Sequence, residues 1–145
     1  MIRRAAVGLA AALTVTPAFA TTQGTYDFAY TDPGQISLVG RLTGEAIDSN
    51  TVKVLSLVSL SFDGATVDVS TLAITGSVSS PVFSRPGVDP KVTFSGSAMD
   101  WGQVNAARNN YFGFVAGVSG APAIVDLVIG GTSRTRPFNA QNWSL

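Results

Sequence analysis

The sequence predicts an all-β fold, a single antiparallel β-sandwich (jelly-roll-like) of about 7–8 strands, with a small β-barrel as the alternative. Three observations indicate this class. Short segments alternate between apolar and polar residues, turn residues separate them at short spacing, and no strongly amphipathic helix follows the first 20 residues. A period of two residues is typical of half-buried strands, which cover a core with one face.

The first 20 residues have the order of a secretory signal peptide. Arg3 and Arg4 form a basic start, a short apolar run follows, and Ala18 and Ala20 supply the small-residue site for cleavage after Ala20. The apolar run is too short to span a bilayer. We therefore predict an exported bacterial protein, secreted, periplasmic or at the cell surface. Its mature part, residues 21–145, is expected to be one β-sandwich domain without a membrane span.

The amino-acid composition excludes several kinds of catalytic and metal-binding site. The chain has no cysteine and no histidine, which removes disulfides, Ser-His-Asp and thiolate catalysis, and nearly all zinc, copper and haem ligation. We expect no cofactor. Loss of Arg3 and Arg4 with the leader reduces nine basic residues to seven against nine acidic ones, a net charge of −2. Because no basic patch stands out, no nucleic-acid partner is expected.

The clearest local signal is the dipeptide Asp63-Gly64 between two alternating runs. Both residues tolerate positive φ, as a two-residue hairpin turn requires. We expect the second arm to continue to Ile74. The predicted cross-strand pairs, all on one face, are Phe62–Ala65, Leu60–Val67 and Val58–Val69.

Two strands precede this hairpin. Residues 25–30 alternate around aromatic side chains, and residues 35–43 alternate again after a turn at Asp32-Pro33-Gly34, where proline presets φ and glycine takes a positive φ. The side chains expected to face the core are Tyr26, Phe28, Tyr30, Ile36, Leu38 and Leu42.

Further strands are expected later in the chain. Residues 76–91 carry three prolines and predict a surface loop or edge crossing, residues 92–101 a strand, and residues 102–109 at most a helical turn. A second hairpin turning at residues 119–122 pairs Phe114 with Leu127 and Phe112 with Ile129. Both of its faces are largely apolar, which is typical of covered central strands. A last strand is expected around Trp143.

Carboxylates are the remaining candidates for catalysis, since a glycan hydrolase needs two of them around the scissile bond. Asp68, Asp100, Asp126 and Glu45 are the candidates, and Asp100 and Asp126 are the pair of most interest. Asp68 also fits a solvated position on the outer face of the first hairpin. Asp126 faces Val115 in the predicted register, so it lies at a rim or binds a buried partner such as Arg134 or Arg136.

Metal and ligand sites have weaker signals. Four aspartates, Asp27, Asp32, Asp48 and Asp63, are scattered as turn formers without the spacing of a calcium loop. Trp101, Tyr111 and Trp143 lie near predicted strand ends and are the candidates for stacking on a sugar. A place in the core is the alternative for each tryptophan.

Several strings resemble bacterial exported proteins of the PEP-CTERM type: TYDFAY at residues 25–30, GRLTG at 40–44, NTVKV at 50–54, VSLSFDG at 58–64, VTFSG at 92–96 and FNAQNWSL at 138–145. The resemblance implies a surface or matrix protein and supplies no catalytic residue. The chain lacks the Val-Pro-Glu-Pro sorting tail, which argues against membrane sorting.

These observations favour a non-enzymatic exported module at the cell surface or matrix, with a glycan or another surface protein as partner. A carboxylate-dependent glycan hydrolase is the first alternative. A small outer-membrane β-barrel is the second, although Ser59, Ser61, Thr66 and Asp68 would occupy the face where a barrel needs an apolar band.

Overall fold

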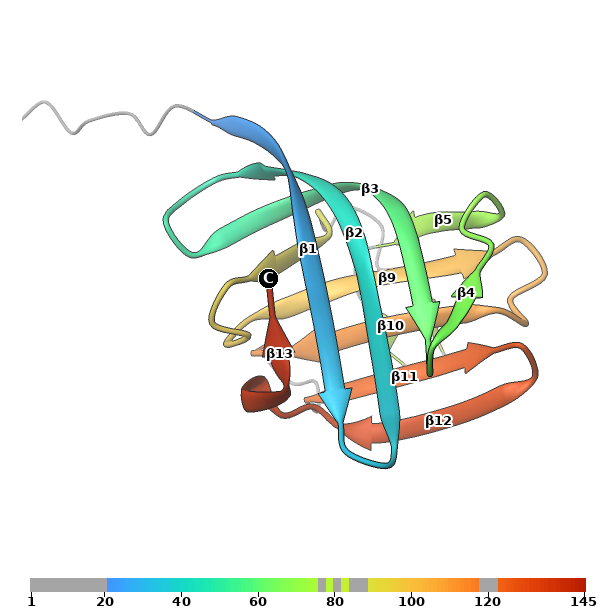
Figure 1. Cartoon of the computed structure of the whole chain (residues 1–145). Coiled ribbons are helices and arrows are strands. Elements are labelled where there is room, and N and C mark those ends of the chain that lie inside the picture. The colour runs from blue at the N-terminus through green and yellow to red at the C-terminus, as the bar shows by residue number, and fades with distance from the viewer. Residues whose placement is uncertain (1–20, 76–77, 80–81, 84–88, 118–122) are drawn as a thin grey trace, which may run out of the picture.

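The all-β class is confirmed by the structure, a computed structural model that describes residues 21–75, 78–79, 82–83, 89–117 and 123–145. Strands make up most of this part of the chain, and its one helix is a short 3₁₀ turn, η1 (Ala140–Asn142) (Figure 1). The predicted leader, with Ala18 and Ala20, lies outside the described residues. So do most of the three-proline segment and the tip of the second hairpin.

Seven of the described strands have six or more residues, and the others have two to four. The strands are β1 (Thr22–Asp32), β2 (Ile36–Ala46), β3 (Thr51–Phe62), β4 (Ala65–Val67), β5 (Leu72–Thr75), β6 (Val78–Ser79), β7 (Val82–Phe83), β8 (Lys91–Thr93), β9 (Met99–Asn105), β10 (Tyr111–Ala116), β11 (Ile124–Ile129), β12 (Thr132–Pro137) and β13 (Trp143–Ser144).

One antiparallel sheet is folded over into two layers. Its order is β12-β11-β10-β9-β8-β3-β2-β1-β13, with β4 also beside β3 and β5 also beside β9. In Figure 1, β1 to β3 run steeply across the front while β9 to β12 cross behind them. The short strand β8 joins the layers, because it pairs with both β3 and β9. Steeply crossed layers joined at a corner form an orthogonal sandwich, or half-barrel.

The first hairpin has the predicted turn. Asp63 and Gly64 have φ of 48° and 84°, and the pairs Phe62–Ala65 and Leu60–Val67 form. The expected continuation to Ile74 is wrong, since β4 ends at Val67 and no Val58–Val69 pair forms. The chain instead crosses to the other layer, where β5 pairs with β9.

Two irregularities in β3 explain why Val58 departs from the predicted face. Val58 has no partner on β2, because it falls between the pairs Arg41–Ser59 and Leu42–Leu57. Leu55 has none either, because it falls between the pairs Thr43–Ser56 and Gly44–Val54. Each extra residue is a β-bulge, which breaks the period of two and bends the strand. As a result Val58 is 48% and Leu55 38% exposed, while Leu60 is buried.

The inner faces predicted for β1 and β2 are confirmed. Phe28, Tyr30, Ile36, Leu38 and Leu42 are buried, and Tyr26 packs against this core. The turn between the strands also forms as predicted, with Gly34 at φ 71° and the Gln35 N–H donating to the Asp32 carbonyl oxygen at 2.9 Å.

Gly40 lies at the inward position of β2 between Leu38 and Leu42. A Cβ atom there would lie 2.5 Å from the Ser59 carbonyl oxygen and 2.7 Å from the ring of Phe28. The glycine therefore makes room for that ring against the sheet.

The second hairpin has a different register from the predicted one. Phe112 pairs with Leu127 and Phe114 with Val125, a shift of two residues that leaves every side chain on its expected face. The shift has a local cause, because β10 ends at Ala116 and Gly117 has φ 66°. The connection is thus longer than a four-residue turn.

The strand expected at residues 92–101 is two strands, β8 and β9, separated by a turn. Thr93 closes that turn through its Oγ1, which donates to the Ala98 carbonyl oxygen and accepts from the Ala98 N–H, both at 3.1 Å. The prediction of at most a helical turn over residues 102–109 is wrong for residues 102–105, which belong to β9. A turn follows, in which the Arg108 N–H donates to the Asn105 carbonyl oxygen at 2.9 Å. Strand β12 was not predicted, because Thr132–Pro137 has little apolar content.

Aromatic side chains from both layers fill the core. Trp101 lies at its centre, with the rings of Phe28, Phe112 and Phe114 at centroid distances of 5.0, 5.2 and 6.0 Å. Strand β13, expected around Trp143, is confirmed and pairs with β1. Among the described residues, no helix is long and apolar enough to cross a membrane.

Candidate functional site

The two tryptophans considered for sugar stacking lie in the core. Trp101 is fully buried and Trp143 is 7% exposed. The Trp143 indole Nε1–H donates to the Thr93 carbonyl oxygen at 2.8 Å. Neither ring therefore presents a face to solvent. Tyr111, the third candidate, is half-buried on the outer face of the second layer.

Asp126 is buried on that same outer face, at 2% exposure. Its Oδ1 accepts from Thr135 Oγ1 at 2.6 Å and its Oδ2 from the Tyr111 hydroxyl at 3.3 Å. The prediction that Asp126 lies opposite Val115 is wrong, since Asp126 pairs with Gly113. The prediction of Arg134 or Arg136 as its partner is wrong too. Thr135 lies opposite Asp126 on β12, and because alternate residues of a strand face opposite sides, the two arginines face away from Asp126.

The flanking arginines bind on the inner side. Arg134 Nη1 lies 3.0 Å from Asp63 Oδ2, and Arg136 Nη2 donates to Gln35 Oε1 at 2.7 Å. These contacts tie β12 to the turns of the front layer.

Asp100 shares the outer face with Asp126 and is 4% exposed. It lies opposite Val115 on β9, whereas Asp126 lies opposite Gly113 on β11. Two strand spacings and two residues of offset separate their Cα atoms by about 12 Å. Glu45 lies opposite Lys53 near the end of β2.

The contact between Tyr111 and Asp126 predicts a pH effect. Burial, and then the Asp126 carboxylate, raise the pKa of Tyr111 above its ordinary value of 10.0. The unfolded chain then loses this proton at lower pH than the folded chain, so stability falls as pH rises above about 10. We expect Asp126→Asn to lower the pKa of Tyr111 and make this loss shallower. Tyrosinate absorbance measures the pKa, with Tyr111→Phe as the control that assigns the signal; an unchanged pKa would contradict the coupling.

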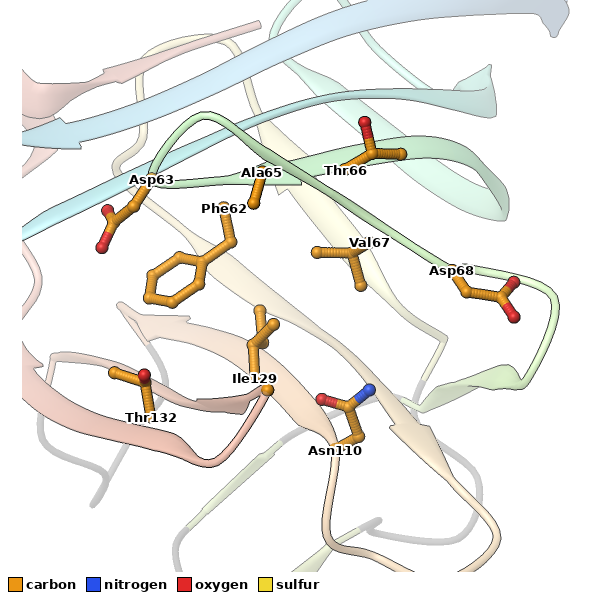
Figure 2. Close-up of a pocket in the computed structure, with 10 residues that line it drawn as sticks. Phe62, Asp63, Ala65, Thr66, Val67, Asp68, Asn110, Ile129 and Thr132 are labelled. Carbon is orange, nitrogen blue, oxygen red and sulfur yellow. The ribbon is translucent and has the colours of Figure 1, made fainter.

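A pocket of about 470 Å³ opens where the first hairpin meets the end of β11 and the start of β10. Figure 2 shows Phe62, Val67 and Ile129 converging on it, with Asn110 entering from the side of the second layer. Phe62 is 7% and Ile129 8% exposed. These three side chains give the pocket an apolar floor.

Hydrogen-bonding groups form the rim. Asp63 and Asp68 flank the pocket at either end, and Thr132 borders it from β12 (Figure 2). Asp68 Oδ1 accepts from both the Ser70 N–H, at 2.9 Å, and its hydroxyl, at 2.7 Å, which holds the pKa of Asp68 below its ordinary value. Asp63 is fixed by Arg134 and by the Ser37 N–H, at 2.9 Å.

Asn110 gives the pocket an unusual acceptor. Its Oδ1 is buried and has no hydrogen-bond partner in the part of the chain that the structure describes. The backbone is fixed by Asn105, whose Oδ1 accepts the Asn110 N–H at 3.1 Å and whose N–H donates to the Asn110 carbonyl oxygen at 3.0 Å. A buried acceptor without a partner is costly, so a ligand donor at this position would be favoured.

Asn110 and Thr132 were not predicted from the sequence. The clustered asparagines at 105, 109 and 110 signal a turn, but nothing local shows that this turn meets the first hairpin. Asp27, expected as a turn former, instead lies within β1 and binds Arg41 at 2.6 Å. Among the described residues, no three acidic side chains gather to hold a metal ion.

Comparison with known proteins gives no match: no family model, no curated protein and no solved structure is significantly similar to this chain. The resemblance to PEP-CTERM-type proteins stays a prediction.

Proposed function

We propose that the chain is an exported, non-enzymatic β-sandwich module of the cell surface or matrix that binds a glycan in the pocket between the first hairpin and the second layer. One observation carries this proposal, the pocket's combination of an apolar floor with a rim of fixed hydrogen-bonding groups.

The floor and the rim suit different parts of a sugar. Phe62, Val67 and Ile129 offer apolar contact to the C–H face of a pyranose ring. The carboxylates of Asp63 and Asp68 accept hydrogen bonds from its hydroxyl groups. The volume lies within the range of small-ligand sites.

Charge at the rim restricts the class of glycan. Asp63 is paired with Arg134, whereas the donors to Asp68 within the described part of the chain are the uncharged N–H and hydroxyl of Ser70. The rim therefore favours neutral sugars over sugars that carry carboxylate or sulfate groups.

A glycan array tests the proposal, with protein produced through its own leader. We expect saturable binding of a neutral glycan, weakened about tenfold or more in Asp68→Ala, because charged hydrogen bonds are the stronger ones. Asp48→Ala is the matched control. Like Asp68, Asp48 is exposed and its Oδ1 accepts the backbone N–H two residues on, at 2.7 Å.

Binding that Asp68→Ala and Asp48→Ala weaken equally would place the ligand elsewhere. A folded protein that binds no glycan on the array would overturn the proposal and direct attention to a protein partner.

A further inference from the structure

Unpaired polar groups continue inward from the pocket. Gln103 is fully buried, and neither its Nε2 nor its Oε1 has a hydrogen-bond partner among the described residues. The Nε1–H of Trp101, two residues before Gln103 on β9, is also buried and has no partner among the described residues. Native cores rarely leave such groups unpaired, and each one calls for an explanation.

Strand register places Gln103 next to the pocket. Gln103 lies opposite Phe112, and Asn105 opposite Asn110. Residues 103, 105, 110 and 112 therefore share the inner face, with Gln103 and Asn110 as diagonal neighbours at about 7–8 Å. Asn110 lines the pocket itself, so Gln103 lies one step deeper on the same face.

We propose that Asn110 and Gln103 form an amide-recognition subsite at the inner end of the pocket, and that the ligand is a neutral sugar carrying an acetamido group. This inference rests on the proposed glycan-binding function and names the class of glycan.

The chemistry of the two side chains supports this class. An acetamido group has one N–H donor and one carbonyl acceptor, and a glutamine amide offers a complementary acceptor and donor. The Asn110 Oδ1 adds an acceptor at the entrance for a hydroxyl group of the same sugar. Phe112 lies opposite Gln103, and Leu127 lies opposite Phe112 on the next strand; both are buried, apolar and on the same face, which suits the acetyl methyl group.

A hydroxyl group in place of the acetamido group would leave much of this subsite unpaired. Sites that hold buried polar groups for a ligand discriminate strongly against analogues that cannot pair with them. Because Gln103 is enclosed in the unliganded chain, the side chains of the pocket floor must part as the acetamido group enters.

Binding of N,N′-diacetylchitobiose and of cellobiose, which differ in the acetamido groups, tests the inference. We expect the wild-type protein to prefer the acetylated disaccharide by at least about tenfold. Gln103→Met keeps the length of the side chain and removes both unpaired groups. It is expected to raise the melting temperature and abolish the preference. Gln23→Met, on the exposed part of β1, is the control and should change neither.

Side-chain amide signals in NMR spectra locate the ligand. Shifts of both the Asn110 and Gln103 NH₂ groups with diacetylchitobiose support the subsite. Equal affinity for the two disaccharides overturns it while leaving the proposed function intact. A melting temperature lowered by Gln103→Met overturns it too, since the amide would then be structural. If neither disaccharide binds, the inference fails, and the proposed function fails with it only if the whole array is silent.

Discussion

Replacement of Trp101 by alanine is expected to lower the free energy of unfolding by about 3–5 kcal/mol, the range for large aromatic residues in cores. The side chain is fully buried and contacts rings from both layers, Phe28 in front and Phe112 and Phe114 behind. Native domains have only about 5–15 kcal/mol in total, so this loss would be a substantial part of the stability of the protein. Urea denaturation followed by circular dichroism measures the change.

Trp101→Phe is the companion variant. Phenylalanine keeps an aromatic ring at the centre of the core and removes the unpaired indole N–H, so we expect a clearly smaller loss. A small effect of Trp101→Ala would show that the two layers do not depend on this ring, which would contradict the described core.

Gly40→Ala is expected to destabilise the protein by about 1–3 kcal/mol, the usual cost of overpacking a core. The new methyl group would meet the Ser59 carbonyl oxygen at 2.5 Å and the Phe28 ring at 2.7 Å. Neither can retreat easily, because one is backbone of the neighbouring strand and the other is packed against Trp101 and Trp143. Thermal unfolding provides the measurement.

Gly24→Ala, in the adjacent strand, is the matched control. Its Cβ would lie no closer than 3.4 Å to the nearest atoms, those of the Tyr26 ring. Since alanine restricts the unfolded chain more than glycine does, this change should be neutral or slightly stabilising. Equal destabilisation by both variants would mean that strand flexibility, not the space under Phe28, determines the effect.

Alternation of apolar and polar residues, together with the turn residues, was sufficient to predict β1, β2 and the turn at Asp63-Gly64. Their buried residues recur every second position, and Asp63-Gly64 admits only a narrow set of turns. Alternation did not predict the position of Val58, because this residue is the extra residue of a β-bulge. An apolar bulge residue cannot be recognised in the sequence, since it looks like one more apolar position of the strand. The second hairpin was placed on its correct faces but two residues out of register, since both alignments bury the same side chains.

The candidate site was harder to predict because it is assembled from distant turns. Phe62 and Asp68 belong to the first hairpin, whereas Asn110 and Thr132 come from the second layer. No local pattern brings them together; the crossing of the layers does. The tryptophans were predicted as ligand contacts from their residue type alone, whereas their size and apolar surface favour the core.

The contact between β13 and β1 has a consequence for how the protein folds. Tyr30 pairs with Trp143, and its hydroxyl donates to the Pro137 carbonyl oxygen across 107 residues of chain. Contacts between such distant segments raise the contact order and slow folding, because a long loop must close first. The front layer is therefore completed only after Trp143 and Ser144 have been synthesised and can pair with β1.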